Sequence, residues 1–103
     1  MSFRRRFGDV IERQLDLFER DRGDLIEACD EALRAYREAA REDAEERYER
    51  FGDLQDEAIE ALDELRDRYA ASLEEDAATR YAAEFDRAAA KRFRGIWIAD
   101  ANR

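Results

Sequence analysis

Carboxylate pairs spaced three residues apart are the feature of this chain that could support chemistry. Glu27 and Asp30 form one such pair, and Glu64 and Asp67 form another. On a helix, side chains three apart project from the same face, and paired carboxylates can hold Mg²⁺. The acid-x-x-acid spacing occurs twelve times among the 28 acidic residues, so we favour a solvated acidic face as its interpretation.

Two of these pairs resemble the Glu-x-x-Glu and Glu-x-x-Asp motifs of the MazG-like nucleotide pyrophosphohydrolases, with Asp30 standing where that family has glutamate. The resemblance implies an all-α oligomer that hydrolyses nucleotides with Mg²⁺ held at Glu27, Asp30, Glu64 and Asp67. The chain has no histidine and one cysteine, which removes the commonest general base and the usual zinc ligands. We therefore expect a protein that is not an enzyme and has no cofactor, with this hydrolase as the alternative.

Basic residues gather at the two ends of an otherwise acidic chain. The net charge is −9, yet residues 1–8 sum to +3 and residues 87–103 sum to +4, which leaves −16 on the 78 residues between them. The overall acidity argues against wrapping nucleic acid and against binding an anionic membrane. Aromatic side chains accompany both basic ends, namely Phe3, Phe7, Phe93 and Trp97.

In a hairpin the two chain ends would form a single basic and aromatic tip. Arginine and tryptophan are enriched at binding hot spots, so we predict that this tip contacts a macromolecule, with a protein as the first choice and nucleic acid as the alternative. The predicted contact residues are Arg4, Arg5, Arg6, Lys91, Arg92, Arg94 and Trp97. For Trp97 we favour a second role, in which it closes the bundle by packing against Phe3, Phe7 or Phe93.

Helical periodicity runs through most of the chain. Apolar residues advance mainly in steps of three and four over residues 11–40 and again over residues 58–85, which is the period of an amphipathic helix. Acid-to-arginine pairs four apart, such as Asp30 and Arg34, each add about 0.3 kcal/mol to helix stability. The sequence therefore predicts an all-α protein.

Glycine and aspartate mark the predicted turns. Gly52-Asp53 divides the chain into two helices of roughly 40 residues, because glycine ends helices and aspartate caps them. Arg41–Asp43 is the second choice for this turn, and a kink at Ser72 would divide the chain into three helices. Gly95 should end the last helix, so we predict a single helical domain at residues 1–94 and a non-helical tail at residues 95–103.

The size of the chain favours association between copies. Only 27 of the 103 residues are apolar and larger than alanine, and small chains with thin cores often gain burial by associating. We predict an elongated antiparallel hairpin that forms a helical bundle with another copy. Cys29 falls in step with the apolar residues and should be buried. No segment has the length of a membrane span, so we expect a small cytoplasmic interaction or scaffold protein.

Overall fold

The described part of the chain consists of helices joined by short turns. The computed structural model describes the backbone of residues 3–101 and the side chains of residues 7–97. Within that range there is no strand, and the all-α prediction is confirmed. The elements are α1 (Phe3–Asp21), α2 (Gly23–Arg37), the 3₁₀ turn η1 (Arg41–Asp43), α3 (Ala44–Ala70), α4 (Glu75–Arg92) and α5 (Arg94–Ala101).

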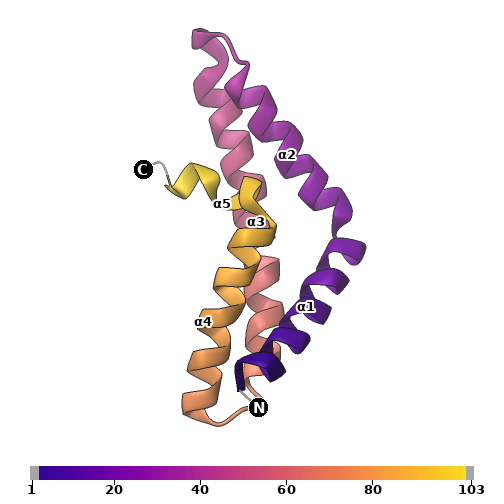
Figure 1. The fold of residues 1–103 in the computed structure, drawn as a ribbon. Coiled ribbons are helices and arrows are strands. Elements are labelled where there is room, and N and C mark those ends of the chain that lie inside the picture. Colours follow the sequence, from indigo (N-terminus) through magenta and orange to yellow (C-terminus); the bar gives the residue numbers. More distant parts are fainter. Residues whose placement is uncertain (1–2, 102–103) are drawn as a thin grey trace.

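These helices make three passes along one long axis. Helices α1 and α2 run in one direction, α3 returns antiparallel to them, and α4 runs parallel to α1 (Figure 1). Helix α5 then crosses beside the middle of the bundle and contacts α2, α3 and α4. The molecule measures 53 × 27 × 21 Å with a radius of gyration of 15.5 Å, whereas a compact chain of this length has about 13 Å.

The predicted turn at Gly52 is wrong, because α3 continues through that residue. Gly52 lies between the buried side chains of Phe51 and Gln55, and packing of this face outweighs the cost of about 1 kcal/mol for a glycine inside a helix. The chain instead reverses over residues 38–43, at the second of the two predicted positions.

A further reversal occurs where the sequence predicts only a kink. Residues 71–74 join α3 to α4, and the Ser72 hydroxyl donates a hydrogen bond of 2.7 Å to the carbonyl oxygen of Tyr69 at the end of α3. Glu74 is extended and leads into α4. Two reversals produce three passes, so the two-helix form of the hairpin is replaced by an arrangement in which α3 is shared by α2 and α4.

The C-terminal segment also differs from its prediction. Residues 95–103 were expected to form a non-helical tail after Gly95, but α5 extends to Ala101. The helical path breaks two residues earlier, at Phe93, which has φ −111° and ψ 58°. No glycine in the described backbone has a positive φ, so Gly95 does not act as a helix stop.

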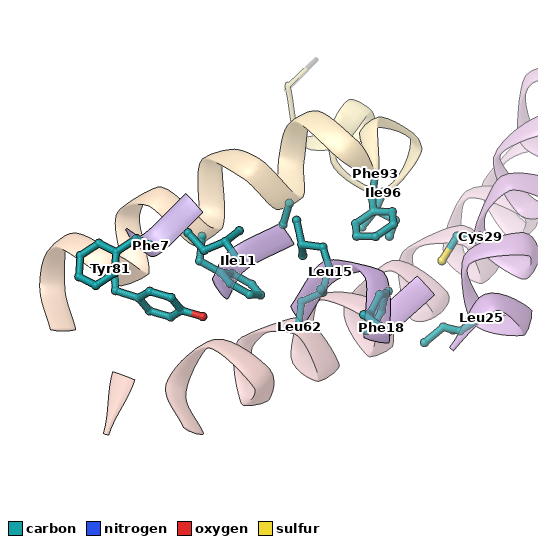
Figure 2. Close-up of a cluster of buried hydrophobic side chains, with 13 residues drawn as sticks. Phe7, Ile11, Leu15, Phe18, Leu25, Cys29, Leu62, Tyr81, Phe93 and Ile96 are labelled. Atoms are coloured by element: carbon teal, nitrogen blue, oxygen red, sulfur yellow. The ribbon is translucent and has the colours of Figure 1, made fainter. Parts of the chain in front are cut away.

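Most of the large apolar side chains among the described residues are buried in one core, to which all five α-helices contribute. The Phe7 ring meets the Tyr81 ring edge-on at a centroid distance of 5.6 Å, and the Phe18 ring meets Phe93 in the same way at 5.5 Å. Figure 2 shows these side chains together with Ile11 and Leu15 along the interface. The buried members of this main core are Phe7, Ile11, Leu15, Phe18, Leu25, Cys29, Ala58, Leu62, Tyr81, Phe85, Ala89, Phe93 and Ile96.

A smaller core stabilises the far end, where α2 and α3 pair alone. Phe51, Leu33 and Ala32 are buried there, and Tyr36 and Leu54 pack against them. A single copy thus covers nearly all of its large apolar side chains, and Leu17 is the exposed exception among the described residues. None of the described helices is long and apolar enough to cross a membrane.

The buried hydroxyl of Tyr81 in the main core has no hydrogen-bond partner among the described residues. A buried unpaired hydroxyl is destabilising, so we expect Tyr81→Phe to raise the free energy of unfolding by about 1 kcal/mol at neutral pH. Burial, and then the neighbouring Tyr69, raise the pKa of Tyr81 from 10 to about 12. Raising pH ionises the phenol of the unfolded chain before that of the folded chain. The stability associated with the neutral Tyr81 side chain is therefore fully present below pH 10 and is lost as pH rises through 12. Urea titrations of the natural chain and of Tyr81→Phe, from neutral pH to pH 12, measure the free energy of unfolding. We expect the variant to be more stable at neutral pH and to lose less stability at alkaline pH. A variant less stable than the natural chain at neutral pH would contradict the prediction.

Cys29 is fully buried, as predicted. Burial, and then the nearby charges of Asp30 and Glu57, raise the pKa of its thiol from 9.0 to about 11. Since the thiolate is the reactive species, we expect iodoacetamide at pH 8 to label Cys29 only in the denatured protein. Intact-mass measurement with and without urea checks this, and rapid labelling of the native protein would contradict it.

Candidate functional site

The junction between α4 and α5, here called the α4–α5 corner (residues 91–97), is the strongest candidate site. It begins where Phe93 leaves the helical path so that its ring can pack against Phe18 in the main core. The backbone N–H of Ile96 then donates to the carbonyl oxygen of Phe93 at 3.0 Å, which closes a tight turn into α5. The break is therefore stabilised by burial of Phe93, which lies between the two helices, and of Ile96 in α5.

Several contacts among the described residues hold α5 against the rest of the molecule. Ile96 is 1% exposed, and the buried amide Nε2 of Gln55 donates a hydrogen bond to the Ile96 carbonyl oxygen. Trp97 is partly buried and packs against the main core. A Cβ at Gly95 would lie 2.8 Å from Asp30 Oδ1, so glycine permits α2 to approach α5 closely here.

Gln55 is a residue that supports the corner and that the sequence reasoning missed. It lies between Phe51 and Ala58, at a position where the three- and four-residue step of α3 calls for an apolar side chain. A polar residue in a core position signals a buried hydrogen bond, and this signal was present in the sequence. The sequence did not identify the partner of this hydrogen bond, because the Ile96 carbonyl comes from a segment 41 residues away.

Unpaired cations surround the anchored part of the corner. Lys91 and Arg94 are exposed and, like Arg87 one turn earlier on α4, form no ion pair with any residue that the structure describes. Arg94 and Trp97 are three apart on α5, which places them on the same side of that short helix. The corner therefore presents positive charge next to a partly exposed indole.

Arg92 has a different environment from its neighbours, because it binds carboxylates of α1. Its Nη2 lies 2.6 Å from Asp16 Oδ1 and 2.8 Å from Glu19 Oε1, and its Nη1 lies 3.6 Å from Glu12 Oε1. The hydrogen bond that Arg92 donates to the Asp16 carboxylate is the largest of the effects that raise the pKa of Arg92 above its ordinary value. Arg92 thus ties α4 to α1, although the sequence grouped it with the residues that contact a partner.

The single tip predicted for the two chain ends does not form. Arg4, Arg5 and Arg6 belong to the first turns of α1, and their side chains, like that of Phe3, lie outside the described residues. Phe7 nearby packs against Tyr81 in the first half of α4, whereas the α4–α5 corner begins at the last two residues of that helix. About 18 Å of helix therefore separates Tyr81 from Phe93 at the corner.

The carboxylate pairs considered for Mg²⁺ are dispersed in the structure. Asp30 lies against Gly95, and Glu64 borders a groove between α1 and α3. Asp67 accepts a hydrogen bond of 2.8 Å from Arg66 Nε, while Glu27 is exposed on α2. In the part of the chain with described side chains, no three potential metal-ligating residues come together as a cation site. The two pairs therefore do not form one four-carboxylate centre.

A shallow cleft of about 280 Å³ opens at the corner. It is lined by the charged residues Asp30, Arg92 and Arg94 and by apolar residues that include Ile26 and Phe93. Mixed charges beside apolar residues suit side chains of a partner protein, which can pair with either sign.

Comparison of the chain with known protein families, with curated proteins and with solved structures finds no match.

Proposed function

We propose that this chain is a helical interaction module that binds an acidic surface of another protein through the α4–α5 corner. The observation that carries the proposal is the placement of Lys91 and Arg94, both exposed and without ion pairs among the described residues, beside the partly buried Trp97. In a chain of net charge −9, such a local cationic patch favours an acidic partner surface.

The anchoring of α5 supports this proposal, because a binding surface is more effective when its residues are already held in place. Phe93, Ile96 and the Gln55 hydrogen bond fix the backbone that carries Arg94 and Trp97. Tryptophan and arginine are the side chains most often found at the centre of protein interfaces. The corner thus combines two favourable residue types on a supported helix.

Comparative affinity capture tests the proposal. The tagged full chain and a Lys91→Glu/Arg94→Glu variant are used as baits with lysate of the source cells, and each captured protein is then purified and titrated against both baits. We expect an acidic partner whose affinity falls about tenfold in the variant and also falls with added salt, because charge attraction is replaced by repulsion.

Arg34→Glu/Arg37→Glu is the matched control, since it reverses two exposed arginines at the last turn of α2, away from the corner. Equal loss in this control would indicate a general charge effect and would contradict the proposed site. Binding that nuclease abolishes would favour the nucleic-acid alternative, and turnover of nucleoside triphosphates with Mg²⁺ would favour the hydrolase alternative.

We also infer that the protein acts in the cytoplasm as a homo-oligomer. The antiparallel pairing of α2 with α3 provides the helical hairpin of this assembly, and the elongated shape supports further packing between copies. In this proposal the second copy and the acidic partner occupy different surfaces, so that one chain can connect copies of itself to another protein.

A further inference from the structure

A groove between α1 and α3 exposes apolar surface on the lower half of the bundle. It has a volume of about 230 Å³ and is lined by Leu17, Phe18, Ala61 and Leu65, with four charged residues at its rim. Leu17 has 40% of its surface exposed and is the exposed large hydrophobic residue among those described. Val10 and Gln14 are partly buried and continue the same side of α1, so the surface extends beyond the groove itself.

The charge of this groove differs from that of the whole chain. Its rim contains two acids, Asp21 and Glu64, and two bases, Arg22 and Arg68, so the rim is neutral in a protein of net charge −9. Two copies approaching through strongly acidic faces would repel one another. A balanced rim avoids that repulsion, and a twofold arrangement lets the acids of one copy face the bases of the other.

The exposed area also favours a second copy. A compact monomer of 12.1 kDa exposes about 6,000 Å², whereas this chain exposes 7430 Å². An interface of ordinary size removes about 800 Å² from each copy, which is more than half of the excess. None of the residues that line the groove belongs to the α4–α5 corner.

We propose that a second copy of this chain docks over the α1–α3 groove, with Leu17 near the centre of a twofold interface. The proposal rests on the inferred homo-oligomer and specifies its surface. Sedimentation velocity over a concentration series gives the dimer dissociation constant for the natural chain and for Leu17→Gln. Loss of a central apolar contact should raise that constant at least about tenfold, while Leu17→Met, which keeps the apolar character, should change it little.

Reversing the rim charges provides a second test that does not depend on Leu17. Arg68→Glu should weaken the dimer, because the rim then carries three acids and one base. Adding Glu64→Arg restores the balance and should recover most of the affinity. Melting curves by circular dichroism establish that each variant is folded. Recovery of the dimer affinity in Arg68→Glu/Glu64→Arg supports pairing of these charges across the interface. If the double variant dimerises as weakly as Arg68→Glu, the proposed interface is wrong.

Cross-linking locates the interface directly. Leu17→Cys should give a covalent dimer with a bifunctional maleimide, whereas Arg37→Cys at the far end of α2 should not, and Cys29 is buried in both. If the chain sediments as a monomer at every concentration tested, both the homo-oligomer and this surface are wrong. The chain could also dimerise with the same dissociation constant in Leu17→Gln and give no more cross-linked dimer from Leu17→Cys than from Arg37→Cys. In that case the homo-oligomer stands and the proposed surface is wrong.

Discussion

Replacing Ile96 with alanine is expected to lower the free energy of unfolding by about 2–5 kcal/mol, the range for removing a large aliphatic side chain from a packed core. Ile96 is 1% exposed, although it lies close to the end of the chain. Its side chain joins α5 to the main core, and its carbonyl oxygen accepts the hydrogen bond from Gln55. A helix of eight residues does not persist without such packing, so the loss should extend to the whole corner.

Chemical denaturation of the natural chain and the variant measures this loss, and the fluorescence of Trp97, the sole tryptophan, reports on the corner. We expect red-shifted emission in native Ile96→Ala, because an undocked α5 exposes the indole to water. Ile96→Val is the matched control and should lose only about 0.5–1.5 kcal/mol with little spectral change. A variant as stable as the natural chain would show that α5 contributes little to the fold.

Reversing the charge of Arg92 should have the next largest effect. Arg92→Glu removes three contacts with α1 and places a fourth carboxylate beside Glu12, Asp16 and Glu19. Exposed ion pairs contribute about 0.2–1 kcal/mol each. Losing these pairs and adding repulsion of similar size should therefore lower the free energy of unfolding by about 1–3 kcal/mol.

Lys91→Glu is the control for this substitution, because Lys91 is adjacent, exposed and without an ion pair among the described residues. We expect it to change stability by less than about 0.5 kcal/mol. In 1 M sodium chloride, where the Debye length is about 3 Å, the difference between the two variants should shrink. Equal losses for both would mean that overall charge, and not the contact with α1, determines the effect.

The two variants also separate stability from binding at the corner. Arg92 pairs with acids of α1, while Lys91 and Arg94 form no ion pair with any described residue. Arg92→Glu should therefore lower stability and weaken binding together, whereas Lys91→Glu/Arg94→Glu should weaken binding in a fully folded protein. This division distinguishes neighbouring residues that the sequence treats as one basic cluster.

The sequence by itself determined the fold class and much of the core. The three- and four-residue spacing of apolar side chains places Ile11, Leu15 and Phe18 on one side of a helix, and all three are buried. The same periodicity includes Cys29, and its burial follows. Such predictions succeed because each depends on residues within a few turns of one helix, where geometry relates spacing directly to orientation.

Only the tertiary structure decided where the chain turns and which residues meet. Gly52 carries a strong local signal for a helix end, yet that signal amounts to about 1 kcal/mol, and burial of Phe51 alone contributes more. The extra reversal at residues 71–74 then separates the chain ends and brings Arg92 to the acids of α1. The partner of Gln55 and the helical form of residues 94–101 depend in the same way on contacts between distant segments, which spacing along one helix does not specify.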